Sequence, residues 1–132
     1  MGRKFLISFV IMFVMTVAFG YIVHDLLLGA DYAQVAQLFR DPADTSHMPF
    51  LFIGQAFYAA GFTWIYLKGK EDKPFLMQGV RYGLAIAALA AVSMYLIYYA
   101  VQPLPGMLVV KQIIFESVGV VLMGIVIAWL NK

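Results

Sequence analysis

The chain has 132 residues, of which 64% are hydrophobic and 12% are charged, with a formal net charge of +2 and a mean hydropathy of +0.88. This apolar share exceeds the roughly 45–50% of ordinary globular domains, and so few charges cannot cover the exterior of a water-soluble protein. The small net charge, without a basic stripe, argues against a nucleic-acid partner, and the lack of Cys excludes disulfides, thiolate metal sites and a Cys nucleophile.

The first apolar segment, residues 5–28, begins with a pattern similar to a secretory signal. Arg3 and Lys4 precede an apolar run, and Ala18-Phe19-Gly20 resembles a small-x-small cleavage site. The apolar run continues beyond that site to Val23. We therefore interpret this segment as an uncleaved first membrane span.

The connector that follows predicts a short amphipathic helix on the outer membrane surface. Asp31 is placed to cap this helix, and the helix ends before Pro42. The residues that recur at three- and four-residue steps, and so form its apolar face, are Tyr32, Val35, Leu38 and Phe39.

Three further apolar segments, 48–67, 78–101 and 107–130, complete the pattern. A helix needs about 20 residues to cross ~30 Å of hydrocarbon, and a helix satisfies its own backbone polar groups there. The short turn at 102–106 requires the third and fourth spans to be antiparallel neighbours. The sequence thus predicts an all-α, integral membrane four-helix bundle that forms a single transmembrane domain over residues 1–132.

The basic residues predict the orientation of the bundle. Seven of the nine Lys and Arg residues lie on the side of the two termini and of the turn at 68–74, and the other two, Arg40 and Lys111, lie opposite. By the positive-inside rule, both termini are expected in the cytoplasm, which makes this a multi-pass protein of the cell inner membrane.

Small residues predict where helices pack closely. Between helices in lipid there is little hydrophobic force, so close approach of backbones through small side chains is a main source of packing energy. On the third span the small residues recur every four positions, and the fourth span has a weaker counterpart: Gly79, Gly83, Ala87 and Ala91, then Gly119 and Gly124. The partner of this face is either another helix of the chain or a neighbouring subunit.

Glu116 is the ionisable residue nearest the membrane midplane, about 15 Å from the start of the fourth span at ~1.5 Å per residue. Such a carboxylate must face protein or water. Together with other polar groups of the outer half, it defines candidate residues for ligand binding or proton relay: His24, Asp25, Gln55, Tyr58, Gln112 and Glu116. The interpretation that the sequence favours is structural, with Glu116 joined to His24 or Gln55 by an interhelical hydrogen bond.

Metal and cofactor sites are not expected. The two His residues, His24 and His47, stand without the spacing of metal or haem ligands. We also assign no catalytic residue, because chemistry normally needs several convergent titratable groups.

Four groups of residues resemble small four-span bacterial membrane proteins that are grouped as domains of unknown function. The groups are Asp25, Leu28, Gly29 and Tyr32; Ala56-Phe57-Tyr58 with Gly61; Gly79 and Gly83; and Glu116 with Gly119. The chain departs from that pattern at Leu28, where a Trp is expected, at Tyr98-Tyr99-Ala100, which replaces an acidic motif, and at Glu116, which replaces Asp. The resemblance implies four spans and supports Asp25 and Glu116 as candidate site residues, and it implies no activity.

These observations favour a non-catalytic accessory or oligomerising subunit of a membrane complex, in contact with the lipid bilayer and present as a homo-oligomer or part of a larger assembly. The alternative is a binder or transporter of a small or lipid-like molecule, through the outer-half polar cluster centred on Glu116. An enzyme is the third and least favoured class.

Overall fold

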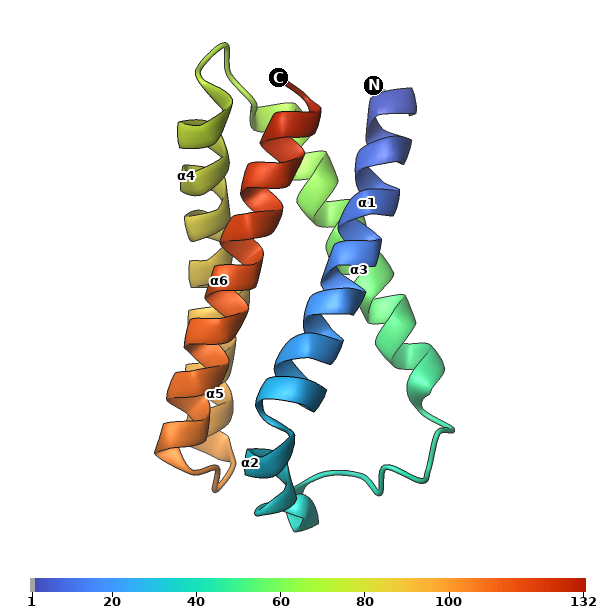
Figure 1. Cartoon of the computed structure of the whole chain (residues 1–132), viewed down its shortest axis with the longest axis vertical. Helices are drawn as coiled ribbons and strands as arrows, with labels where there is room; N and C mark the ends of the chain where they lie inside the picture. Colours follow the sequence, from blue (N-terminus) through green and yellow to red (C-terminus); the bar gives the residue numbers. More distant parts are fainter. Residues whose placement is uncertain (1) are drawn as a thin grey trace.

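The computed structural model describes residues 2–132, which form a bundle of four long apolar helices (Figure 1). The membrane spans are Gly2–Leu27, Met48–Gly69, Phe75–Val101 and Gly106–Leu130. The labelled N and C ends and the α3–α4 connector lie together at one end of the bundle, and α2 lies at the other. The predicted four-helix membrane bundle is confirmed, whereas the side of the membrane that each end faces stays a prediction.

Two of the spans change their winding partway along. The first consists of α1, Gly2–Gly20, followed by the π-helical segment η1, Tyr21–Leu27. The third consists of α4, Phe75–Ala87, the π-helical segment η3, Ala88–Val92, and α5, Ser93–Val101. The second and fourth spans are the uninterrupted helices α3, Met48–Gly69, and α6, Gly106–Leu130.

The closest helix contact joins α4 to α6. A Cβ added at Gly79 would lie 2.6 Å from the Gly124 carbonyl oxygen, and one added at Gly83 would lie 2.6 Å from Val121 Cα. Both obstacles are backbone atoms, so a side chain fits at neither position while the helices keep this spacing. The rest of this face of the third span, Ala87 and Ala91, is also buried. The small-residue face therefore packs against a helix of the same chain.

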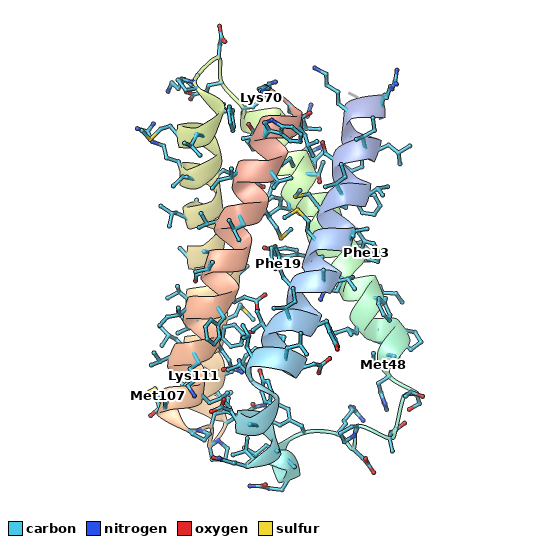
Figure 2. The ribbon with its side chains drawn as sticks, in the orientation of Figure 1. Phe13, Phe19, Met48, Lys70, Met107 and Lys111 are labelled. Atoms are coloured by element: carbon cyan, nitrogen blue, oxygen red, sulfur yellow. The ribbon has the colours of Figure 1, made fainter. Side chains whose placement is uncertain are left out.

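A second interface joins α1 to α3 and α6. Phe19 packs against Gly119, where an added Cβ would lie 3.4 Å from the Phe19 ring, and Figure 2 shows Phe19 between α1 and α6. Near the chain ends, the Asn131 side-chain amide donates to the buried Ser8 hydroxyl at 2.9 Å. The α1 and α6 helices are thus joined both at mid-depth and at the end that holds the termini.

The connector after the first span differs from the expected single helix capped by Asp31. It contains α2, Gly29–Ala33, and a 3₁₀ turn, η2, Ala36–Leu38. The Leu28 N–H bonds to the Val23 carbonyl, and the Leu28 carbonyl accepts from the Tyr32 N–H. The N-cap position of α2 is Leu28, and Asp31 lies within the first turn of α2, so Asp31 does not cap this helix.

Asp31 instead pairs with a cation of α6. Lys111 Nζ lies 3.0 Å from Asp31 Oδ1, and Figure 2 shows Lys111 beside α2. Leu28 and Val35 are buried in one cluster with Leu108 of α6. The connector therefore folds back over the α2 end of the bundle and packs against α6.

Candidate functional site

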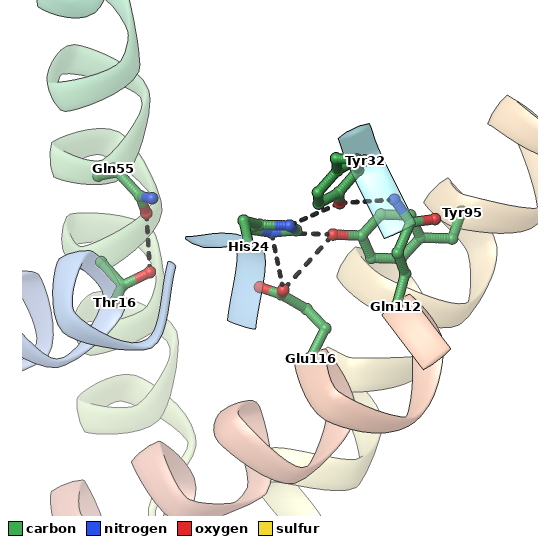
Figure 3. Close-up of polar contacts among 7 residues, drawn as sticks. All are labelled: Thr16, His24, Tyr32, Gln55, Tyr95, Gln112 and Glu116. Atoms are coloured by element: carbon green, nitrogen blue, oxygen red, sulfur yellow. Dashed lines mark hydrogen bonds and ion pairs between the residues drawn. The ribbon is translucent and has the colours of Figure 1, made fainter. Parts of the chain in front are cut away.

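Glu116 lies where the first, third and fourth spans meet. Its Oε2 is 3.5 Å from His24 Nε2 of η1 and 3.4 Å from the Tyr95 hydroxyl of α5 (Figure 3). The His24 and Glu116 side chains are 35% and 30% exposed, respectively. The carboxylate thus faces other helices and an open space within the bundle, as expected for an acid at this depth.

His24 is oriented by the connector that covers the α2 end. Its Nδ1 lies 2.7 Å from the Tyr32 hydroxyl oxygen, and that oxygen accepts a hydrogen bond from Gln112 Nε2 at 2.8 Å. The Tyr32 hydroxyl therefore links His24 of the first span to Gln112 of α6. Burial, which outweighs the hydrogen bond from Gln112, raises the pKa of the Tyr32 phenol, so this group stays protonated and able to donate.

The other ring nitrogen of His24, Nε2, lies 3.5 Å from Glu116 Oε2 and 3.4 Å from the Tyr95 hydroxyl oxygen. Tyr95 donates its hydroxyl proton toward Glu116. His24 Nε2 and the Tyr95 hydroxyl thus both face Glu116, while Gln112 donates to Tyr32. We call these five residues the polar cluster: His24, Tyr32, Tyr95, Gln112 and Glu116.

The two π-helical segments lie beside the polar cluster. The first, η1, contains His24, and the second, η3, ends immediately before the helix that carries Tyr95. Single π turns in α-helices are rare and occur frequently at functional sites. Each π turn changes the direction in which the following side chains point around the helix axis. The positions of His24 and Tyr95 thus depend on local winding that the apolar pattern of the sequence does not indicate.

The structure brings three of the predicted site residues into the polar cluster: His24, Gln112 and Glu116. It places Gln55 apart, where Gln55 Oε1 accepts from the Thr16 hydroxyl at 2.7 Å (Figure 3). Asp25 is exposed and lies outside the cluster. Tyr58 has a buried hydroxyl oxygen that lacks a hydrogen-bond partner within residues 2–132.

Two members of the polar cluster, Tyr32 and Tyr95, are not among the predicted site residues. Tyr32 does lie on the packed apolar face of the connector, against buried Leu28 and Val35. Because the connector folds back onto α6, the Tyr32 hydroxyl also reaches His24 and Gln112. A periodic pattern within one segment does not show that the connector folds back onto another helix.

Two open cavities lie beside the polar cluster. The outer cavity, of about 710 Å³, is at the α2 end, and its polar lining includes His24, Asp25, Tyr32, Arg40 and Asp41. The second, of about 390 Å³, lies between α3 and the η3–α5 segment. We call it the lateral groove; its lining residues are Thr16, Phe50, Leu51, Gly54, Gln55, Tyr58, Ala90, Met94, Glu116 and Val120. Glu116 therefore borders the groove, and its neighbour His24 borders the outer cavity.

Within residues 2–132, no group of three or more His, Cys, Asp or Glu residues is placed to hold a metal ion. Comparisons of the chain with protein-family models, with curated proteins and with solved structures found no match. The resemblance to a four-span family therefore stays a hypothesis, and the site is interpreted from its own geometry.

Proposed function

We propose that this membrane protein binds or transports a small or lipid-like molecule that presents a cationic or hydrogen-bond-donating group to Glu116. The observation that supports this most is the incomplete hydrogen bonding of the Glu116 carboxylate. Its two polar neighbours, His24 Nε2 and the Tyr95 hydroxyl, lie 3.5 and 3.4 Å from Oε2, beyond the usual 2.7–3.2 Å of hydrogen bonds. The carboxylate retains acceptor capacity, and the Glu116 side chain is 30% exposed.

The charges around the site favour a cationic ligand over an anionic one. The acid of the polar cluster is Glu116, and the nearby cation Lys111 is paired with Asp31. An unpaired carboxylate within a membrane costs at least a few kcal/mol, on the order of 3, unless it is protonated or finds a partner. A cationic ligand supplies that partner.

The packing gives less support to an oligomerising role. The face formed by Gly79 and Gly83 motivated that role, and in the structure it is occupied by α6 of the same chain. We also propose a non-catalytic role, because the polar cluster holds one carboxylate and one imidazole, and chemistry normally needs several convergent titratable groups. We likewise propose, from the distribution of Lys and Arg, that both termini face the cytoplasm, the α2 end faces outward and the membrane is the cell inner membrane.

Thermal unfolding of the protein in lipid nanodiscs tests the proposed function. The ligands are short primary and quaternary ammonium ions, compared with carboxylates of the same size. We expect ammonium ions to raise the unfolding temperature of the wild type and of Asp25→Asn, and to leave that of Glu116→Gln unchanged. Asp25 is the matched control because it is an exposed acid near the same end and lies outside the polar cluster.

Two results would overturn the proposal. One is equal stabilisation of Glu116→Gln and the wild type by ammonium ions. The other is the same stabilisation by carboxylates as by ammonium ions. Circular dichroism of each variant without ligand confirms that the comparison is made between folded proteins.

A further inference from the structure

We propose that the ligand is an amphiphile with one hydrocarbon chain and a protonated amine, and that it reaches Glu116 sideways from the lipid through the lateral groove. This inference rests on the proposed function of Glu116 and adds the ligand class and its route. It is independent of the outer cavity, which offers a route from water.

The lateral groove exists because the outer part of α3 leaves the bundle. Every residue of 48–54 is exposed, whereas Ala59, Phe62 and Thr63, farther along the same helix, are buried. Figure 1 shows α3 diverging from α5 and α6 toward the first connector. Gly54 of α3 and Ala90 of η3 line the groove with small side chains, and a Cβ added at Gly54 would meet nothing within 4 Å. The groove is thus open between two spans.

The lining of the groove changes from apolar to polar along its depth. Phe50, Leu51 and Met94 line it and are exposed on the outside of their spans, Phe50 at 70% and Leu51 at 51%. In a bilayer these exposed side chains contact lipid. Glu116 and Tyr58 border the groove on its bundle side. This order matches a molecule whose hydrocarbon chain stays with the lipid while its head group enters the bundle.

Glu116 is suited to an ammonium head group because its carboxylate keeps acceptor capacity. An ammonium group has three N–H donors and no acceptor, so it can donate to this carboxylate. Within the described residues 2–132, Glu116 is the one charged residue that lines the groove, so an anionic head group meets an unfavourable charge. A volume of about 390 Å³ is near the lower end of ligand pockets, roughly 300–1,000 Å³, which suits one chain.

Photolabelling in nanodiscs tests this inference. The probe is a long-chain primary amine with a diazirine in the middle of its chain, and its control is the same chain with a carboxylate head. Labelled peptides are identified by mass spectrometry. For the wild type we expect the amine to label the α3 segment that contains Phe50 and Leu51 and the α5 segment that contains Met94, and we expect the carboxylate to label them far less.

Two glycine-to-leucine substitutions on α3 distinguish the effect of filling the groove from the effect of adding a side chain elsewhere on this helix. Gly54→Leu places a side chain in the groove, while Gly61→Leu places one on the inner half of the same helix, where an added Cβ also meets nothing within 4 Å. We expect labelling to fall about tenfold in Glu116→Gln, as for loss of a charged hydrogen bond, to fall in Gly54→Leu and to be retained in Gly61→Leu. Ala90→Leu, on the opposite wall, replaces Gly54→Leu if that variant does not fold.

Equal labelling by the amine and the carboxylate, or unchanged labelling in both Glu116→Gln and the groove-filling variant, would overturn the inference. If short ammonium ions stabilise the protein through Glu116 while the long-chain amine does not label the groove, the lateral route is wrong and the proposed function stands. If Glu116→Gln changes neither the stabilisation by short ammonium ions nor the labelling by the long-chain amine, both proposals are wrong.

Discussion

Replacing Gly83 with alanine adds one methyl group at the closest contact between α4 and α6. The new Cβ would lie 2.6 Å from Val121 Cα and 3.1 Å from the Val120 carbonyl oxygen. Ordinary contact begins at 3.4 Å, so the two helices must separate by roughly 0.8 Å at this level. Neither neighbour is a flexible side chain that can rotate away.

The expected cost is that of overpacking a tight interface, about 1–3 kcal/mol in the free energy of unfolding. Separation also weakens the neighbouring contact of Gly79 with Gly124, so we expect the upper part of this range. Gly61→Ala is the matched control, because its added Cβ meets nothing within 4 Å. Glycine within a helix costs roughly 0.5–1 kcal/mol relative to alanine, so the control is expected to be neutral or slightly stabilising.

Reversible unfolding in mixed micelles, followed by far-ultraviolet circular dichroism, measures both variants under the same conditions. The reasoning predicts a lower midpoint for Gly83→Ala and an unchanged or higher midpoint for Gly61→Ala. If the two variants have the same midpoint, or if Gly83→Ala is as stable as the wild type, the α4–α6 contact is not as close as described.

Three other changes test the α2 end and the orientation of the chain. Lys111→Met removes the partly exposed ion pair with Asp31, so we expect a loss of about 0–1 kcal/mol and faster hydrogen exchange in residues 29–38; unchanged exchange would mean that the pair does not hold the connector. Tyr32→Phe leaves a buried amide donor unpaired, which should cost about 1–3 kcal/mol in unfolding experiments, and a wild-type midpoint would argue against that hydrogen bond. The chain lacks Cys, so single Cys substitutions at Ser46 and Asp72 report topology, and an impermeant maleimide should label them from opposite sides of the membrane. Labelling of both from one side would contradict the four-span arrangement.

The sequence was sufficient to predict the membrane bundle because hydrocarbon restricts the backbone so strongly. An apolar stretch of about 20 residues must satisfy its own N–H and C=O groups, and a helix does so locally, without information from the rest of the chain. For the same reason, the position of Glu116 along one span predicts both its depth in the membrane and its need for a polar or charged partner. Spacing by four residues likewise identified Gly79 and Gly83 as a contact face.

The tertiary structure decided what these faces and polar groups meet. It showed that Gly83 packs against α6 of the same chain, that Asp31 pairs with Lys111 instead of capping a helix, and that Tyr32 turns toward His24. Each of these contacts joins residues of different helices or connectors, and it depends on helix crossing, on π turns and on the path of a connector. Periodicity describes one helix at a time, so it predicts which side of a helix is buried, whereas the identity of the partner depends on how all four helices pack together.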